Sequence, residues 1–392
     1  MRILVVGSGG REHALSRALA ASPHTEALFI APGNPGTAQC GTNIDIDAND
    51  LDGLVDWAQE NRIDLTIVGP EQPLVHGLVD RFEAHDLRIV GPSQAAAQLE
   101  GSKAFANRFM DRHGIPTASF QVFSADEAEA AATYIDDVGA PIVVKADGLA
   151  AGKGAFVCST REEAHDALTQ IVRDRAFGAA GDQVVIEEKM EGEEVSVLAL
   201  TDGSHYVLLT PAQDHKPIGE GGTGPNTGGM GAFAPAPIMD SSLLTRVCRE
   251  IIEPTLRGMS EEGTPYRGVL YCGLMITDDG PKVVEYNCRL GDPEAQVVLP
   301  LVESDLVTVF DRLVEGELQT LSLRASSGAA ACVVLASEGY PIEYDTGVEI
   351  TGVEAAEALD KVSVVHAGTR RQSDDTLVTA GGRVLGVTGR GV

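Results

Sequence analysis

Short apolar runs that each end in a glycine- or proline-rich turn recur through the first hundred residues. The runs are 3–6, 28–30, 65–68 and 87–90, and helical stretches such as 50–61 and 74–84 separate them. Continuous apolar strands that alternate with helices are typical of a parallel sheet covered on both faces. The pattern therefore predicts a doubly wound α/β domain over residues 1–100, with ligands bound at the turns that follow the strands.

From residue 101 the pattern changes to helices mixed with strands of a different order. Expected helices are 101–113, 125–137, 161–174 and 241–262. Expected strands are 141–145, 156–158, 183–187, 195–200, 206–210, 268–277 and 281–287. The stretch 214–237 looks irregular. We predict an α+β middle domain over 101–327 with a lid subdomain at about 120–190.

The last part of the chain, 328–392, has little helical pattern. Its expected strands are 329–335, 347–350, 362–366 and 383–388. This spacing predicts a small, mostly-β C-terminal domain. The fold class expected for the whole chain is thus a multidomain protein of α/β and α+β units.

The charge balance excludes some classes of function. The 392 residues include 58 acidic and 29 basic side chains, giving a formal net charge of −29. A nucleic-acid binder needs a basic surface to displace counterions, and none is evident here. The longest apolar run, near 329–336, is far shorter than the ~20 residues that cross a bilayer. Met1 and Arg2 lead into a strand and a turn instead of a secretory signal, so we expect a cytoplasmic protein.

Lysine and cysteine usage adds two expectations. Only seven of the basic residues are lysine, and a very acidic, lysine-poor chain suggests adaptation to high salt, which screens self-repulsion. The six cysteines form no C-x-x-C pair, so free thiols are expected instead of disulfides or a zinc site.

The first candidate motif is "GSGGREH", directly after the first strand. Gly7 and Gly9 fit a dinucleotide-binding turn, but Glu12 stands where the next glycine is expected. Two other interpretations remain open. The turn could hold a phosphate or ribose on backbone N–H groups at a helix N-terminus, or it could be a tight turn without a ligand.

The second candidate is a set of lysines near glycines. Lys145 ends an apolar strand and so needs an anionic partner, and the following loop carries Gly148, Lys153 and two further glycines. With Lys103 in "LEGSKAF", these residues suit polyphosphate, although the Walker A spacing is absent. A surface hairpin with a solvated lysine is the alternative.

Two acidic motifs complete the middle domain. "VVIEEKMEGEEVSV" carries glutamates between two apolar strands, which suits a nucleotide-binding hinge as well as a solvated acidic face. In "KVVEYNCRLGDPEAQ", Glu285, Asn287 and Arg289 alternate along a strand and share one face. Their oxygen atoms suit Mg²⁺ bound together with substrate phosphates, and Arg289 adds an anion clamp.

A glycine-rich stretch follows Asp214, His215 and Lys216. Seven of the thirteen residues from Gly219 to Gly231 are glycine, and structureless loops of this length are usually functional. Asp214 and His215 could form an acid/base pair, but adjacent side chains on an extended chain diverge.

Together these motifs resemble the ATP-grasp superfamily and, more closely, the phosphoribosylamine–glycine ligase family. The resemblance covers the whole chain in order. It rests on "GSGGREHAL", "APGNPGT", "TIVGPEQPLV", "QLEGSKAF", "VVKADGLAAGKG", "QDHK", "GPNTGGMGA" and "NCRLGDPEAQ". One departure lies past "GGRVLGVTG", where family members continue with a helix-containing segment and this sequence stops at Val392. The completeness of the last domain is therefore an open question.

The resemblance implies a reaction in purine biosynthesis. ATP, glycine and 5-phosphoribosylamine would give ADP, phosphate and glycinamide ribonucleotide through glycyl phosphate. The substrates would be small molecules, and the cation would be Mg²⁺ or Mn²⁺. The protein would be a monomer, and loops 148–154 and 219–231 would close as lids. The rivals are another ATP-grasp carboxylate–amine ligase or carboxylase, and a nucleotide-binding protein without catalysis.

The resemblance also implies roles for individual residues. Those expected to bind ATP are Lys103, Lys145, Gly152, Lys153, Gly154, Glu187, Glu188 and Glu194. The expected metal ligands are Glu285 and Asn287, and the expected catalytic residues are Arg289, Asp292 and Asp214. Residues expected at the phosphoribosyl substrate are Gly9, Gly10, Arg11, Asn34, Gly36 and Lys216.

Overall fold

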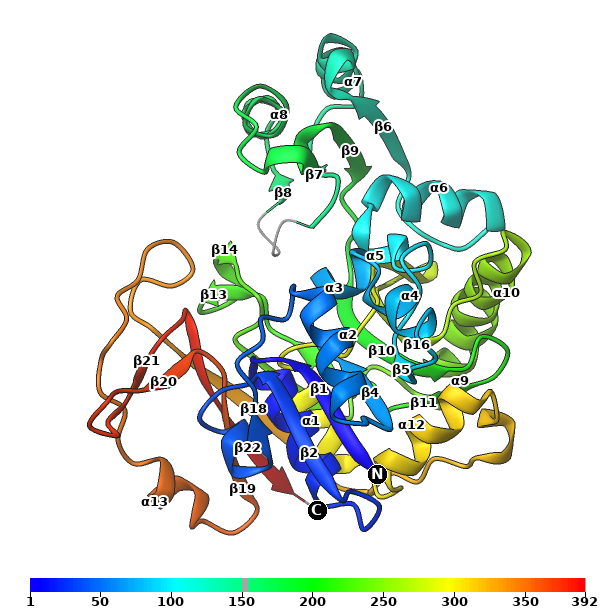
Figure 1. Ribbon diagram of the computed structural model, residues 1–392. Helices are drawn as coiled ribbons and strands as arrows, with labels where there is room; N and C mark the ends of the chain where they lie inside the picture. The colour runs from blue at the N-terminus through cyan, green and yellow to red at the C-terminus, as the bar shows by residue number, and fades with distance from the viewer. Residues whose placement is uncertain (150–153, 392) are drawn as a thin grey trace.

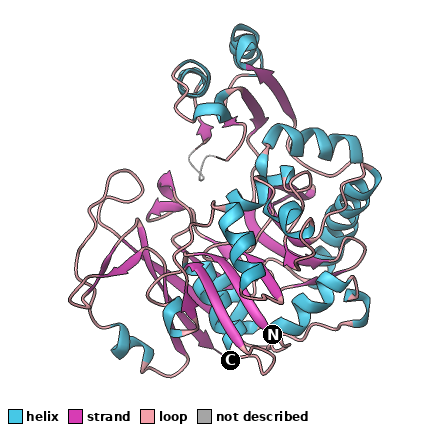
Figure 2. Ribbon diagram, viewed as in Figure 1, coloured by secondary structure: helices cyan, strands magenta, loops and turns pink. Residues whose placement is uncertain are grey.

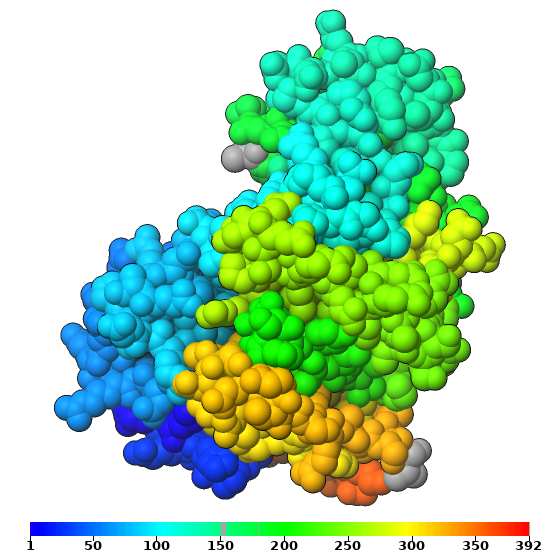
Figure 3. Space-filling model, turned by 90° about the vertical axis from the view of Figure 1, so that its right-hand side faces the viewer, coloured from blue at the N-terminus to red at the C-terminus, as the bar shows by residue number. Residues whose placement is uncertain are grey.

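The computed structural model describes residues 1–149 and 154–391. A broad lower body contains both ends of the chain, and a smaller unit of residues from about 120 to 190 stands above it (Figure 1). Seen from the side, this unit rises from the body at one end only (Figure 3). Among the described residues no helix is long and apolar enough to cross a membrane.

The N-terminal sheet is parallel, as predicted, with the strand order β3-β2-β1-β4-β5. Its strands are β1 (Arg2–Gly7), β2 (Ala27–Pro32), β3 (Thr42–Asn43), β4 (Leu65–Val68) and β5 (Ile89–Val90). Its helices are α1 (Gly10–Ala20), α2 (Leu51–Glu60), α3 (Glu71–Val75) and α4 (Leu78–Glu83). The sequence pattern missed β3, because two residues carry no periodicity. The predicted helix at 74–84 is two short helices instead, separated by a turn at Gly77, which has φ 85°.

Side chains of β1 enter the core on both faces of this sheet. Leu4 and Val6 belong to an apolar cluster that includes Tyr286, whereas Ile3 and Val5 belong to another that includes Phe310. Alternation with a period of two explains this division. Because both clusters extend into the middle of the chain, the turn after β1 is held in a fixed position against the strands that carry the candidate metal ligands.

The middle of the chain forms two antiparallel sheets (Figure 2). The sheet in the body has the order β11-β10-β16-β17 and consists of β10 (Glu193–Thr201), β11 (Tyr206–Leu208), β16 (Gly268–Thr277) and β17 (Gly280–Asn287). The predicted helix at 241–262 is α9 (Ser241–Val247), a π-helical turn and α10 (Glu253–Glu261).

The upper unit contains the second of these sheets, with the order β6-β9-β7-β8. It consists of β6 (Phe120–Ser124), β7 (Ile142–Ala146), β8 (Ala155–Cys158) and β9 (Gln183–Glu188), with α7 (Ala128–Val138) and α8 (Arg161–Leu168). These helices pack on the sheet through a small apolar cluster of their own. The unit corresponds to the expected lid subdomain, and its limits remain a prediction.

The bounds of α6, the helix before the upper unit, are set by a capping residue at each end. α6 (Lys103–His113) follows α5 (Gln98–Gly101), and the Ser102 side chain accepts a hydrogen bond from Phe105 N at 2.9 Å as its N-cap. The helix stops at Gly114, whose φ of 63° lies in the left-handed region that glycine adopts without strain. Lys103 is thereby placed at the first turn of α6.

The last sheet corrects two expectations. Its order is β12-β15-β18-β22-β19, and β12 (Gln213–Asp214) and β15 (Gly231–Ala234) come from the stretch predicted to be irregular. The other strands are β18 (Ala329–Ala336), β19 (Val362–His366) and β22 (Arg383–Gly391). The predicted strand at 347–350 is wrong, since only an isolated bridge joins Glu349 to Val378 there. β12 and β15 precede residue 328 and share this sheet with β18, β19 and β22, which follow it. The expected domain boundary at 328 stays a prediction.

The remaining short elements surround these sheets. The glycine-rich stretch forms a hairpin of β13 (Pro217–Gly219) and β14 (Thr223–Asn226) instead of an open loop. The others are α11 (Ala295–Val298), α12 (Leu306–Glu315), α13 (Val353–Glu357), β20 (Thr369–Arg371) and β21 (Leu377–Thr379).

Candidate active site

The candidate metal ligands, Glu285 and Asn287, lie two residues apart near the end of β17. Glu285 pairs with Gly273 of β16, and Asn287 pairs with Tyr271. A side chain at position 273 would crowd this row, since a Cβ there would lie 3.2 Å from Glu285 Cγ. Glycine in the middle of β16 therefore leaves the space that the Glu285 side chain occupies.

Glu285 is a partly buried carboxylate surrounded by cations. Burial alone would raise its pKa, but the surrounding charges outweigh burial and lower the pKa to about 2. These cations are Lys216, Lys145, Lys103 and Arg289. The nearest contact is Lys216 Nζ, 3.5 Å from Glu285 Oε1. Glu285 is thus ionised at neutral pH and can offer charge to a divalent cation.

Asn287 offers a second oxygen on the same face. Its Oδ1 accepts a hydrogen bond from Arg289 Nη2 at 3.1 Å, which leaves one of the two lone pairs of the carbonyl oxygen. A carboxylate and an amide oxygen are hard donors of the kind that Mg²⁺ takes together with phosphate oxygens. The residues present therefore fit the expected cation.

Lys145 and Glu187 form a buried ion pair. Lys145 Nζ lies 2.6 Å from Glu187 Oε2 and donates to the Val284 carbonyl at 3.2 Å. The other carboxylate oxygen of Glu187 accepts from Asn107 Nδ2 at 2.9 Å. Both oxygens of Glu187 thus contact other side chains of the protein, and Glu187 orients Lys145. Its expected contact with adenine or ribose stays a prediction.

Lys103 approaches the same centre from α6. Its Nζ donates to the Gly148 carbonyl at 2.9 Å. Burial, and then the charge of Lys145, lower its pKa, although Glu285 opposes the shift. The expected ATP contacts Gly152 and Lys153 lie outside the described residues. Gly154 contributes its carbonyl to a hydrogen bond from Ala146 N at 2.7 Å.

The other two glutamates expected at ATP, Glu188 and Glu194, do not lie beside Lys145 and Glu187 but have different partners. Glu188 is exposed, accepts from Ser119 N at 3.1 Å and lies 3.6 Å from Lys282, away from Lys145. Glu194 lies 3.2 Å from Lys216 Nζ. Adjacent side chains on β9 point to opposite sides of the sheet, which explains why Glu187 and Glu188 do not act together.

Lys216 and Asp214 lie close to Glu285, one of the candidate metal ligands on β17. Lys216 bridges Glu194 and Glu285, and its expected role in binding substrate stays a prediction. Burial raises the pKa of Asp214 to about 7, since the attraction of Lys216 is offset by the nearby carboxylates. Asp214 and His215 do not form a pair, because the His215 ring packs against Phe233 at 5.9 Å between centroids.

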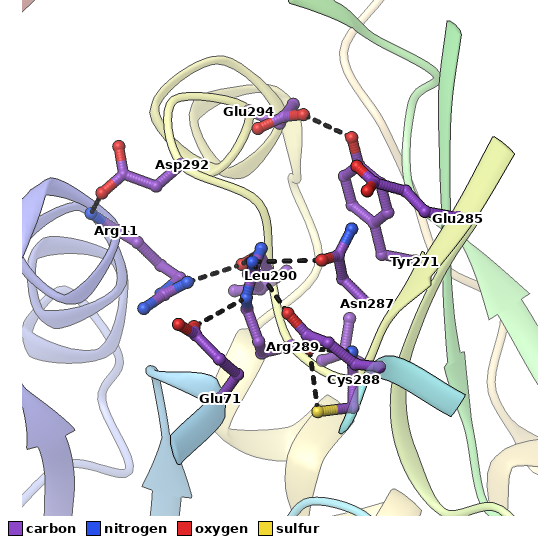
Figure 4. Close-up of polar contacts among 12 residues, drawn as sticks. Arg11, Glu71, Tyr271, Glu285, Asn287, Cys288, Arg289, Leu290, Asp292 and Glu294 are labelled. Atoms are coloured by element: carbon purple, nitrogen blue, oxygen red, sulfur yellow. Dashed lines mark hydrogen bonds and ion pairs between the residues drawn. The ribbon is translucent and has the colours of Figure 1, made fainter. Parts of the chain in front are cut away.

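Arg289 lies between two carboxylates (Figure 4). Its guanidinium contacts Glu71 Oε2 at 3.3 Å and Glu100 Oε1 at 3.0 Å. The guanidinium also donates to the Leu290 carbonyl at 3.3 Å. Burial lowers and these carboxylates raise the pKa of Arg289, with a net increase, so the guanidinium is charged and fixed beside Asn287.

The turn after β1 is occupied by the protein's own carboxylates. Gly9 N donates to Glu12 Oε2 at 2.5 Å, and Arg11 N donates to Asp292 Oδ2 at 3.3 Å. A Cβ at Gly7 would lie 2.6 Å from Glu12 Cγ. The Glu12 side chain therefore explains why position 7 is glycine, and it stands where a dinucleotide-binding turn would have its third glycine. Carboxylates thus accept from both backbone N–H groups, and the expected substrate site on Gly9 and Arg11 stays a prediction. Gly10 shares this turn, where a Cβ would lie 2.6 Å from Gln296 Nε2.

Asn34 and Gly36 join the first and last domains. Asn34 Nδ2 donates to the carbonyls of Ser8 at 2.7 Å and His366 at 3.0 Å, while its Oδ1 accepts from Gly36 N at 2.8 Å. The Asn34 amide and Gly36 N thus hydrogen-bond within the protein, where they hold the first and last domains together. Their expected contact with substrate stays a prediction.

Asp292 lies at this junction too. It accepts from Gln296 Nε2 at 2.7 Å, and Arg383 Nη1 lies 3.4 Å from its carboxylate. Burial opposes ionisation, but Arg383 and Arg11 hold the pKa of Asp292 below its usual range. Arg383 also donates to the Gly228 carbonyl at 2.5 Å, and so connects β22 to the end of the hairpin stretch.

Comparison with known proteins agrees with this geometry. Models of the phosphoribosylglycinamide synthetase N domain, ATP-grasp (A) domain and C domain match residues 1–100, 101–295 and 330–392. The phosphoribosylamine–glycine ligase of Rhodopirellula baltica is 51% identical over 397 residues, covering 99% of this chain and 90% of that protein. The chain belongs to the phosphoribosylamine–glycine ligase family.

Two further relatives extend this result. The phosphoribosylamine–glycine ligase of Vibrio parahaemolyticus is 51% identical over 394 residues, covering 100% of this chain and 91% of that protein. The crystal structure of the phosphoribosylamine–glycine ligase of Thermotoga maritima aligns with a TM-score of 0.84 at 34% identity, covering 100% of this chain and 93% of that one. The fold class predicted for this member of the family is therefore confirmed.

Sequence reasoning missed several site residues of this phosphoribosylamine–glycine ligase family member. They are Glu12, Glu71, Glu100, Glu294 and Arg383. Glu294 is buried and accepts from Tyr271 Oη at 2.7 Å, close to Asp214 and Glu285. Four of the five lie within the motifs that carried the resemblance, and this was the signal available. Arg383 begins the last strand without any such signal.

Proposed function

We propose that this enzyme ligates glycine to 5-phosphoribosylamine with ATP, giving glycinamide ribonucleotide, ADP and phosphate in purine biosynthesis. The observation that carries this proposal is the cluster of Lys103, Lys145 and Lys216 around Glu285, in a chain that matches the family over its full length. Three cations around one oxygen-donor pair suit the binding of a triphosphate and a divalent cation.

The first step activates the glycine carboxylate. An oxygen of glycine attacks the γ-phosphorus of ATP, a new P–O bond forms, the bond to the β-phosphate breaks, and ADP leaves. Phosphoryl transfer needs positioning and neutralisation of charge more than a protein nucleophile. Lys103 and Lys145 would bind phosphate oxygens, and Glu285 with Asn287 would hold Mg²⁺, which would neutralise phosphate charge.

The second step forms the amide. The amine nitrogen of phosphoribosylamine attacks the carbonyl carbon of glycyl phosphate, the C–N bond forms, and the C–O bond to phosphate breaks. The proton that the nitrogen loses leaves with the phosphate. Arg289 is fixed beside Asn287 and would stabilise charge on the acyl phosphate. Glycyl phosphate is exposed to hydrolysis, so we propose that the exposed β13–β14 hairpin covers the site during turnover.

For the phosphoribosyl group we propose a place next to the one expected from the sequence. Because Glu12 and Asp292 occupy the amides after β1, we propose that the sugar binds where Arg11, Asp292 and Arg383 meet, between the first and last domains. Asp292 offers acceptors for hydroxyl groups and Arg383 a cation for phosphate.

The glycine ammonium group is assigned to Asp214. Replacing Asp214 with asparagine removes a charged acceptor, so we expect the KM for glycine to rise about 10- to 100-fold, the equivalent of one charge-assisted hydrogen bond. The KM for ATP should change less than about threefold, because Lys103 and Lys145 are untouched. Steady-state kinetics with glycine as the varied substrate measure both; an unchanged KM for glycine would move the ammonium site elsewhere.

The proposed function is tested by ADP release in the presence of glycine and freshly generated phosphoribosylamine. We expect ADP to form in step with glycinamide ribonucleotide, detected by its mass, and only when both substrates are present. ADP release that is independent of the amine, or equal with other amino acids, would exclude this function.

The acidity of the chain leads to a prediction about salt. With a net charge of −29, the native state is under self-repulsion, which added salt screens. We propose adaptation to high salt and expect the Tm to rise between dilute buffer and molar KCl. A Tm that is indifferent to KCl over this range would contradict the adaptation.

We further propose that the enzyme acts as a cytoplasmic monomer. Its expected substrates are small polar molecules, and the centre described above is formed by residues of one chain. Sedimentation at micromolar concentration should show one species with the mass of a single chain, and a larger species would contradict this.

A further inference from the structure

Glu100 lies under the candidate active site, between two segments that both contribute to it. It is in α5, three residues before Lys103, and its side chain is only 7% exposed. Its Oε1 lies 3.0 Å from Arg289 Nη2. Its Oε2 accepts from the backbone N of Cys288 at 2.7 Å and from Cys288 Sγ at 3.0 Å.

The backbone contact fixes the strand that carries the metal ligands. Cys288 stands between Asn287 and Arg289, just past the end of β17, where the chain leaves the sheet. The hydrogen bond from its N–H to Glu100 Oε2 is short, and burial raises the pKa of this carboxyl while the Arg289 charge opposes the shift. Glu100 therefore holds the end of β17 against the turn that begins α6 and places Lys103.

The ion pair fixes the direction of Arg289. Glu71 approaches the guanidinium from α3 of the N-terminal domain and Glu100 approaches it from α5, with contacts of 3.3 and 3.0 Å. One N–H of Nη2 donates to Asn287 Oδ1 and one N–H of Nη1 donates to the Leu290 carbonyl, which leaves the second N–H of Nη1 for a substrate. A planar guanidinium that is held at several of its donors cannot rotate freely, which is the condition for acting at a reacting phosphate.

We propose that Glu100 is a positioning residue of this enzyme, which acts through Arg289 and the end of β17 without touching the substrates. The inference rests on the proposed ligation reaction. One buried carboxylate sets the spacing between the segment of Lys103 and the strand of Glu285, Asn287 and Arg289, and it keeps the guanidinium aimed at the acyl phosphate.

Three substitutions separate the contributions of Glu100. Glu100→Gln keeps the volume and an acceptor for Cys288 N but removes the charge that holds Arg289, so kcat should fall about 10-fold, with the KM for ATP and glycine within about threefold. Glu100→Ala removes both contacts, and kcat should fall about 100-fold. Glu100→Asp restores the charge on a shorter side chain, and its kcat should exceed that of Glu100→Gln.

A double substitution tests whether Glu100 acts through Arg289. If it does, adding Glu100→Gln to an Arg289→Lys enzyme should lower kcat by less than about twofold, because the interaction is already lost. Losses that multiply to the full 10-fold in the double variant would overturn the assignment.

The control is Glu83→Gln, the same change at an exposed carboxylate on α4. Its kcat and Tm should equal those of the wild type. A kcat for Glu100→Gln within twofold of the wild type, in protein that is folded by its melting transition, would overturn the proposal. If Glu100→Gln does not fold, Glu100→Asp decides by the same criterion. If the wild-type enzyme itself released no ADP with glycine and phosphoribosylamine, the proposed function would fail first, and this inference with it.

Discussion

Replacing Glu285 with glutamine is expected to abolish measurable turnover, a loss of at least about 1000-fold in kcat. The carboxylate lies within a group of cations that keep it ionised, and it supplies the negative charge with which a divalent cation is bound. An amide of the same size has no charge to offer. The measurement is kcat at saturating ATP, glycine and Mg²⁺.

The fold should survive this change. Glutamine fits the space opposite Gly273, so the melting transition of Glu285→Gln should stay cooperative. Glu60→Gln, at an exposed position at the end of α2, provides the same chemical change away from the site and should retain the wild-type kcat. Wild-type rates in Glu285→Gln at saturating Mg²⁺ would place the metal site elsewhere.

Replacing Lys145 with glutamine should have the second largest effect. The lysine is expected to hold ATP phosphates, so kcat/KM for ATP should fall about 100- to 1000-fold. The change also leaves Glu187 as a buried carboxylate without its partner at 2.6 Å, which should lower the free energy of unfolding by about 3–5 kcal/mol. Steady-state kinetics and denaturant unfolding measure the two effects.

A second substitution separates activity from stability. In Lys145→Gln/Glu187→Gln the buried charge is gone, so most of the lost stability should return while kcat/KM for ATP stays low. Recovery of activity together with stability would show that Lys145 has a structural role only.

Elements formed by local patterns could be predicted from the sequence. The apolar runs of β1, β4 and β7 and the boundaries of α6, set by Ser102 and Gly114, depend on neighbouring residues. Pairing between distant segments could not be predicted. β15 joins the last sheet because Phe233 pairs with Ala331 across about a hundred residues, and no turn or period announces that contact.

The same distinction applies to the site. Glu285, Asn287 and Arg289 could be grouped in advance because they alternate along one strand. The partners of Arg289 could not, since Glu71 and Glu100 come from other elements and the choice of partner depends on tertiary packing. The contact between Glu187 and Lys145 could not be predicted either, since it depends on the register of β7 on β9.

The central claim is that glycine is activated as an acyl phosphate in this site and then captured by the amine. Glycine labelled with ¹⁸O in both carboxylate oxygens tests it directly, because the mechanism leaves one of these oxygens on phosphate when the amide forms. We predict one ¹⁸O in the phosphate for each glycinamide ribonucleotide formed. Phosphate without label, at the same yield of product, would contradict the account.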